Sequence, residues 1–185
     1  MNLSSYAELA VRLANTAAQA DGEPDALSST ASCEKTFSDC IAVQVSRRDL
    51  VVLQYLRAEL GAIFTAAAAG NDKAAVSRLN ALLIQFPIQP ELVSHDEQRW
   101  HVHLAPQGSA SDQVAASAII GIALTISLYG VGRLGVCAIA SCPRVFVDAS
   151  PNQSRRYCAE HPARGNVSTL RTQSAMPRQA TPAAS

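Results

Sequence analysis

The sequence lacks the short motifs that carry common enzymatic chemistry. It has no glycine-rich loop that would hold phosphates, no dinucleotide-binding fingerprint, and no serine, histidine and aspartate in an order known from hydrolases. These absences argue against nucleotide-dependent enzymes and against hydrolases with a serine nucleophile. We therefore expect a protein that is not an enzyme.

The sequence also has no net charge, because 15 basic residues balance 15 acidic ones. The balance is uneven along the chain. The first 132 residues hold eight basic and 13 acidic side chains, whereas the rest hold seven arginines and two acidic side chains, a net charge of +5. A basic end on an acidic body is expected of a protein that meets a polyanion, and a solvated basic tail gives the same pattern.

No hydrophobic run is long enough to cross a membrane. The longest, at residues 114–129, has about 16 residues against the roughly 20 that a spanning helix needs, and we interpret it as a buried core helix. The N-terminal segment has no basic start followed by an apolar core and a cleavage site. The sequence therefore predicts a cytoplasmic protein with no membrane partner. In that reducing compartment, close cysteine pairs are more often metal ligands than disulfides.

Hydrophobic residues recur with helical spacing in four segments, which predicts a mainly α-helical fold. The predicted helices comprise residues 6–20, 47–69, 72–86 and 111–129. Ser46 is expected to cap the second helix and Gly70 to close it, while Asp72 caps the third and Pro87 stops it. Because the second and third helices have only about two residues between them, they should form an antiparallel helical hairpin.

Residues 21–46 are rich in glycine, proline, serine and threonine, which predicts a long irregular segment. It contains Cys33 and Cys40. The segment offers no partners for a metal site, so both are expected to be ordinary, half-buried residues.

A short β-hairpin is predicted where residues 92–93 and 100–104 flank a polar turn. His101 and His103 project from one face of its second strand. No aspartate, glutamate or cysteine is placed to complete a metal site with them. We interpret this face as a polar strand edge.

Three cysteines and a histidine have the spacing of a zinc site. Cys137 and Cys142 have four residues between them. Fifteen further residues separate Cys142 from Cys158, and His161 lies three positions after Cys158. Thiolates and imidazole are the ligands that Zn²⁺ prefers in closed, four-coordinate structural sites. The sequence therefore predicts a small zinc-binding module, with unligated core cysteines as the alternative.

The residues between the two pairs explain how they could meet. Residues 145–147 alternate like a strand and residues 148–153 are turn-forming, so an outward strand, a turn and a return would bring the pairs together. Asp148 is an alternative to His161 as the fourth ligand, but its place in the turn disfavours it. A catalytic zinc would need an open position and a general base, for which Glu160 alone is weak support.

Arginines accompany this segment. Those predicted to contact nucleic acid are Arg144, Arg155, Arg156, Arg164 and Arg171. Guanidinium groups held on a metal-pinned scaffold suit bidentate contacts with phosphates. Each arginine could instead satisfy loop carbonyls or a nearby acid such as Asp148, so the two roles stay open for any single side chain.

The segment RLGVCAIASCPRVFVDASPNQSRRYC, residues 133–158, resembles the CGNR zinc finger. The preceding chain resembles the ABATE-type domain that accompanies this finger in stress-induced transcription regulators, through AVRLANT, LRAELGAIFTAAAAGN, LNALL and WHVHL. The resemblance implies a helical N-terminal domain and a zinc-binding, DNA-binding C-terminus. The expected organisation is an ABATE-like domain at 1–132, a CGNR-like finger at 133–172 and a disordered tail at 173–185.

The resemblance differs at the fourth ligand. Three of the family's metal cysteines match Cys137, Cys142 and Cys158. The family has its fourth cysteine before Gly-Asn-Arg, whereas this chain has Ala163, with four residues between it and Cys158, followed by RGNV at 164–167. His161 is the natural substitute.

The leading functional hypothesis is a transcription regulator whose zinc module contacts DNA. Zinc would fold the loop, arginines would meet phosphates, and a helix after Asn166 would approach a groove. Because so short a module binds weakly alone, a homodimer that makes two contacts is expected. The helical domain would either form this dimer or bind a small-molecule or protein ligand. The alternative is a protein-interaction or metal-sensing module in which zinc is only a structural clamp.

Overall fold

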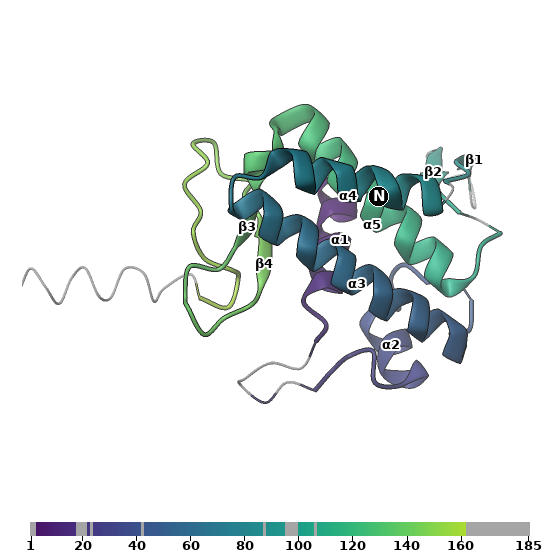
Figure 1. Cartoon of the computed structure of the whole chain (residues 1–185). Helices are drawn as coiled ribbons and strands as arrows, with labels where there is room; N and C mark the ends of the chain where they lie inside the picture. The colour runs from purple at the N-terminus through teal and green to yellow at the C-terminus, as the bar shows by residue number, and fades with distance from the viewer. Residues whose placement is uncertain are drawn as a thin grey trace, which may run out of the picture.

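The computed structural model describes residues 3–17, 22, 24–41, 43–86, 88–94, 100–105 and 107–161. These residues form a mainly helical protein with two separate antiparallel strand pairs, which confirms the predicted fold class (Figure 1). The helices are α1 (Leu3–Ala14), α2 (Thr30–Thr36), α3 (Arg47–Ala68), α4 (Asp72–Gln85) and α5 (Ala110–Tyr129), with a short 3₁₀ helix η1 (Val131–Arg133). The strands are β1 (Glu91–Val93), β2 (His101–His103), β3 (Leu134–Val136) and β4 (Val145–Val147).

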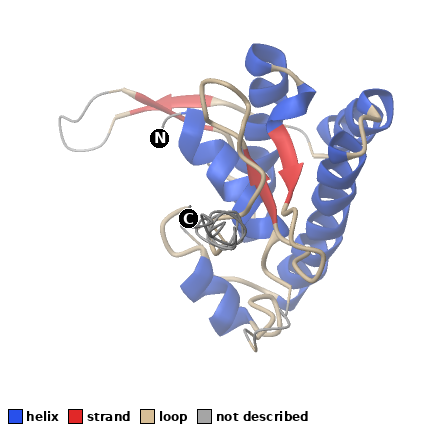
Figure 2. Cartoon of the chain, turned by 90° about the vertical axis from the view of Figure 1, so that its left-hand side faces the viewer, coloured by secondary structure: helices blue, strands red, loops and turns tan. Residues whose placement is uncertain are grey.

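The two strand pairs lie at opposite ends of the helical body. In Figure 1 the β1–β2 hairpin is at the right and the β3–β4 pair at the left, with α3 and α4 side by side in front of α1 and α5. Figure 2 is viewed from the left-hand end, where β3 and β4 lie against the helices and the β1–β2 hairpin projects away. The segment that carries the predicted zinc ligands therefore lies at the β3–β4 end of the helical body.

The closest helix packing is between α1 and α5. Gly121 of α5 faces the backbone of Tyr6 and Ala7 so closely that a Cβ atom on Gly121 would lie 2.5 Å from the Tyr6 carbonyl oxygen. Leu9, Leu13 and Ile122 are among the fully buried or nearly buried residues of this contact region. The glycine lets the two helices approach to backbone contact.

The run that we interpreted as too short to span a membrane is part of a 20-residue helix, so the argument from its length was wrong. By length and apolar composition alone, α5 and α3 could each cross a bilayer, a property that core helices share. Eleven residues of α5 are buried inside the protein. The interpretation of α5 as a core helix rests on this burial.

Side-chain caps begin the long helices. Ser46 and Asp49 form a reciprocal capping box at α3, and Ser109 and Asp112 form another at α5. Asp49 is buried and also accepts hydrogen bonds from the backbone and hydroxyl of Ser111 at 3.0 and 2.8 Å. Burial acts to raise the pKa of Asp49, but the hydrogen bonds from Ser46 and Ser111 outweigh it and hold that pKa well below its usual range. One carboxylate thus joins the starts of two helices.

Three local predictions were wrong: the end of one helix, the cap of another and the absence of helix from residues 21–46. Helix α1 ends at Ala14, and the described residues after it form a turn; residues 18–20 of the predicted helix lie outside the described residues. The N-cap of α4 is Asn71, whose side chain accepts from the Ala74 N–H, so Asp72 is instead the first helical residue. The segment expected to be irregular contains α2.

Helix α2 forms because local and tertiary contacts coincide. Ser29 caps its first turn, and Cys33 and Phe37, four residues apart on one face, are fully buried in the main core. Cys40 is half-buried and its thiol contacts Arg12. Neither cysteine belongs to a metal-binding cluster among the described residues.

The predicted β-hairpin is confirmed, with Glu91 paired to His103 and Val93 paired to His101. His103 is half-buried and joins no metal cluster within the described ranges. The side chain of His101 lies outside the described residues.

Candidate metal centre

The C-terminal module, residues 133–161 of the described chain, begins with the β3–β4 pair. Leu134 pairs with Val147 and Val136 with Val145, and the Cys137 N–H donates to the Arg144 carbonyl at 2.9 Å to extend the ladder. The strand predicted at 145–147 is confirmed. Its partner is β3, however, and not the return segment that leads to Cys158. The first cysteine pair therefore lies in the turn of a hairpin, where backbone pairing fixes its spacing.

The return segment is shaped by Asp148. This buried carboxylate accepts hydrogen bonds from the backbone N–H groups of Ser150 and Arg155, at 2.7 and 2.9 Å. Burial acts to raise the pKa of Asp148, and the hydrogen bonds from Ser150 and Arg155 with the nearby Arg133 charge leave it below its usual value. Since both carboxylate oxygens are used in this way, Asp148 holds the turn and is not one of the clustered donors.

A second backbone contact brings the two ligand pairs together. The Ala138 N–H donates to the Arg156 carbonyl at 2.9 Å, which places the return segment against the hairpin turn. The His161 N–H then donates to the Cys158 carbonyl, closing a short turn. Ile139 and Tyr157 pack against the cysteines and cover them.

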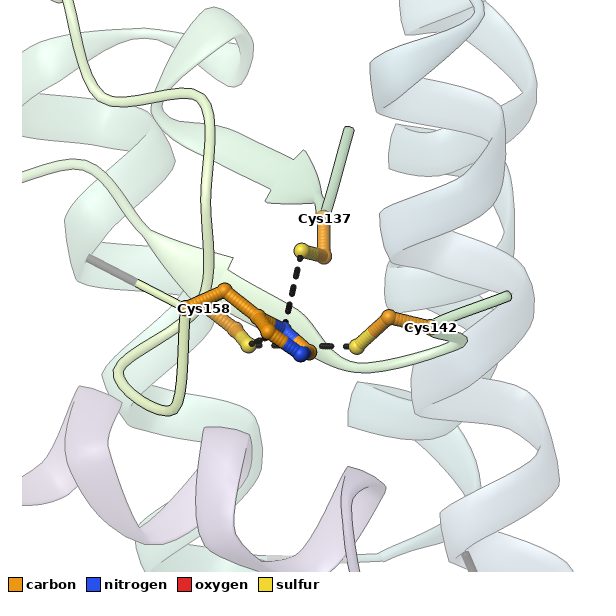
Figure 3. A group of neighbouring side chains, drawn as sticks. Cys137, Cys142 and Cys158 are labelled. Atoms are coloured by element: carbon orange, nitrogen blue, oxygen red, sulfur yellow. Dashed lines mark hydrogen bonds between the residues drawn. The ribbon is translucent and has the colours of Figure 1, made fainter. Parts of the chain in front are cut away.

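The four predicted donors converge on one point. Cys137, Cys142 and Cys158 are buried, His161 is half-buried, and their ligand atoms all lie within 4.8 Å of one another. Figure 3 shows the three sulfur atoms directed toward one another from the hairpin turn and the return segment. The side chain of His161 contributes its Nδ1 atom, which is 3.6 Å from the Cys137 sulfur and 3.2 Å from the Cys158 sulfur.

These separations fit a tetrahedral ion. Zinc bound by sulfur at about 2.3 Å and by nitrogen at about 2.0 Å places two sulfur donors about 3.8 Å apart and a sulfur and a nitrogen about 3.5 Å apart. The sulfur atoms of Cys142 and Cys158 are 3.8 Å apart. The separations of 3.2, 3.6 and 3.8 Å lie within about 0.3 Å of these values, and three thiols with one imidazole are a donor set that suits zinc.

The thiols are unequal in acidity. Burial acts to raise the pKa of Cys137, but hydrogen bonds from the backbone N–H groups of Cys158 and Ile139 outweigh it, so that pKa lies below its ordinary value. For Cys158, burial together with the neighbouring thiols raises the pKa to about 11, despite a hydrogen bond from the Glu160 backbone. Three thiolates this close together repel one another, so the three thiols lose their protons together only when a cation is bound among them.

The predicted arginines are placed differently from one another. The Arg156 side chain is exposed, and Arg144 is half-buried. Arg155 is used within the module, because its Nε donates to the Tyr157 carbonyl at 2.9 Å and its guanidinium stacks on the Phe146 ring, 5.1 Å from the centroid. Arg164 and Arg171, like the predicted tail at 173–185, lie outside the described residues.

Phe146 explains why Arg155 is held. A Cβ atom at Gly135 would lie 2.5 Å from the ring of Phe146, so the glycine leaves room for the ring on the neighbouring strand. The Arg155 guanidinium packs on the same ring. Arg133, to which the sequence assigned no separate role, donates to the carbonyls of Asp148 and Ser150.

The module is joined to the helical body by Asn15. The Asn15 side chain donates to the Val145 carbonyl at 3.0 Å and accepts from the Val145 N–H at 2.8 Å, as a neighbouring strand would. Leu134 and Val145 are themselves part of the main hydrophobic core. Sequence reasoning missed Asn15; its only signal was its position inside the AVRLANT segment.

We expect Asn15→Ala to destabilise the protein by about 2 kcal/mol, because two half-buried backbone groups of Val145 lose their partners. Zinc content should stay unchanged, since no ligand is altered. Denaturant unfolding of the zinc-loaded protein measures the loss. Asn80→Ala on the exposed face of α4 is the control and should change stability by no more than about 0.5 kcal/mol; equal effects of the two substitutions would contradict the bridging role.

Two family models match the chain. One, ABATE, described as "Putative stress-induced transcription regulator", matches residues 7–125, which is more than half of the chain. The protein belongs to the ABATE family. The other model, the CGNR zinc finger, matches residues 133–172 of this ABATE protein and includes the four clustered donors. The resemblance recognised in the sequence is thereby confirmed. No curated protein matches this ABATE chain.

Proposed function

We propose that this protein is a DNA-binding transcription regulator whose C-terminal module is folded by one structural Zn²⁺. Cys137, Cys142, Cys158 and His161 would hold the ion. The observation that carries the zinc assignment is the convergence of three thiols and one imidazole, whose ligand atoms all lie within 4.8 Å of one another. Because the four protein donors fill a tetrahedral shell, the ion would have a structural role and the protein no enzymatic one.

The DNA contact is supported by charge. From residue 133 onward the chain carries seven arginines against two acidic residues. Arg156 is exposed beside the metal centre and its backbone carbonyl is anchored to the hairpin turn, so its guanidinium extends from a fixed point. A guanidinium presented in this way suits a phosphate contact. In the proposal the protein acts in the cytoplasm as a homodimer, which supplies two such contacts.

DNA binding is tested by a salt series with zinc-loaded protein and duplex DNA. We expect the logarithm of affinity to fall linearly with the logarithm of salt concentration, and Arg156→Gln to reduce the slope by about 0.9 and to weaken binding. Arg78→Gln is the control, because Arg78 is an exposed arginine of α4 that pairs with Glu59. It should leave the slope unchanged.

Arg155 is unsuitable for this test, since removing it also removes the contact with Phe146. An absence of binding at low salt, in protein that contains one equivalent of zinc, would overturn the DNA-binding proposal. The same result would favour the alternative in which the module is a structural clamp for a protein partner.

A further inference from the structure

A cleft of about 590 Å³ lies between the helical body and the C-terminal module. One wall comes from α1, with Ala7 and Val11, and from the end of α5, with Tyr129. The opposite wall comes from β4 and the residues that follow it, and it reaches Cys158 of the metal centre. A cleft of this size matches the pockets that hold small organic ligands.

Four arginines from different parts of the chain line the cleft. They are Arg12, Arg133, Arg144 and Arg155. Arg12 comes from α1 and the other three belong to the module, so cations line the cleft from both sides of the junction. The buried Nε atoms of Arg12 and Arg133 have no hydrogen-bond partner in the described part of the chain. Other nitrogen atoms of the two groups are already used, because Arg12 pairs with Asp39 and Arg133 donates to the carbonyls of Asp148 and Ser150.

The charge balance limits the kind of anion. Three carboxylates, Glu8, Asp148 and Glu160, line the same cleft, and a fourth, Asp39, pairs with Arg12 at 2.9 Å, so the four arginines carry little excess positive charge. A phosphate would bring a charge of about −1.5 to −2, whereas a carboxylate brings −1. A monoanionic carboxylate therefore fits better than a phosphate group. Its planar, bidentate geometry also matches the guanidinium fork.

The remaining lining is apolar. Val11, Val145 and Tyr129 lie along the cleft beside the arginines, with alanine side chains between them. Small-molecule sites combine a mostly apolar wall with a few polar groups that fix orientation. The ligand's body should accordingly be aliphatic or aromatic.

We propose that this cleft binds a small amphipathic carboxylate, with its acid group on the arginines and its apolar body against α1 and β4. The ligand would contact the helical body and the metal-bearing module at once, and so would favour the arrangement in which the two are docked. The binding site itself does not depend on DNA binding. Its regulatory consequence, a change in DNA affinity when the carboxylate binds, rests on the proposed function.

The test is an NMR titration of the zinc-loaded full chain with 4-phenylbutyrate, beside its neutral amide, 4-phenylbutyramide. We expect saturable shifts of the backbone amides of Glu8, Val11 and residues 145–149, with a dissociation constant on the order of 1 mM. The amide should bind at least about ten-fold more weakly, because it lacks the charge that the guanidiniums recognise. Equal binding of acid and amide, or shifts confined to other residues, would overturn the proposal.

Two substitutions locate the site. Arg144→Gln should weaken 4-phenylbutyrate binding about ten-fold. Ala149→Trp, at an exposed position of the lining, should also weaken it by reducing the space. Arg78→Gln, outside the lining, should have no effect. If both cleft variants keep their NMR fold and bind like the unaltered protein, the assignment of the cleft is wrong.

The link to regulation is measured separately, as DNA affinity with and without saturating 4-phenylbutyrate. A changed affinity supports the regulatory consequence. Carboxylate binding with unchanged DNA affinity would keep the site and overturn the consequence. Carboxylate binding by a protein that does not bind DNA at all would overturn the proposed function and leave the ligand site standing.

Discussion

Replacing Cys142 with serine is expected to abolish zinc retention and to release the return segment of the C-terminal module. Cys142 is buried, and its sulfur lies at the spacing from Cys158 that a shared ion requires. A serine hydroxyl is a poor substitute for a thiolate, and structural zinc contributes about 10–16 kcal/mol to the folding of small zinc-finger peptides. Within residues 133–161, Ile139 and Tyr157 are the hydrophobic side chains that pack against the three cysteines, so little other burial there can replace the metal.

The measurement is zinc content by elemental analysis after dialysis, combined with limited proteolysis. The unaltered protein should retain one equivalent of zinc and resist cleavage between residues 148 and 158, whereas Cys142→Ser should retain none and be cut there. Cys40→Ser is the matched control, because Cys40 is a half-buried thiol outside the cluster. A full equivalent in His161→Ala would show that His161 is not the fourth ligand.

Replacing Gly121 with alanine is expected to destabilise the helical body by about 3 kcal/mol, which lowers the midpoint of thermal unfolding by about 6–12 °C. The added Cβ would lie 2.5 Å from the Tyr6 carbonyl oxygen and 2.6 Å from the Ala7 nitrogen. These are backbone atoms, which cannot rotate away as a side chain does. Helices α1 and α5 must therefore separate along their closest contact.

Calorimetry of the zinc-loaded protein measures this effect. Gly61→Ala provides the control, since Gly61 lies within α3 and an added Cβ there meets no atom within 4 Å. That substitution should stabilise the protein by up to about 1 kcal/mol through helix propensity. An unfolding midpoint of Gly121→Ala equal to that of the unaltered protein would contradict the close approach of α1 and α5.

The sequence predicted features that depend on neighbouring residues. The spacing of leucines and the capping serine at position 46 were sufficient for α3, and the turn signals were sufficient for the β1–β2 hairpin. The four clustered donors were found in the same way, because their spacing is local. Helix α2 was missed because its seven residues have weak periodicity, and burial of Cys33 and Phe37 in the core is what stabilises it.

Contacts between distant segments could not be predicted. Nothing near Asn15 shows that it will pair with a strand 130 residues later, and nothing near Arg155 shows that Phe146 will hold its guanidinium. The pairing of β4 with β3 was not predicted for the same reason: the residues of β3 have a strand's pattern only once β4 lies beside them. The arginine-lined cleft likewise exists only after α1 and the module have come together.

The contribution of Leu134 and Val145 to the main core has a consequence for how such proteins can be recombined. The family models divide the chain between residues 125 and 133, which suggests two interchangeable parts. A crossover there would separate these two side chains from the helices that they pack against, and Asn15 from its strand. A functional chimera would therefore have to inherit α1 and the metal-bearing segment from the same parent, although they stand at opposite ends of the chain.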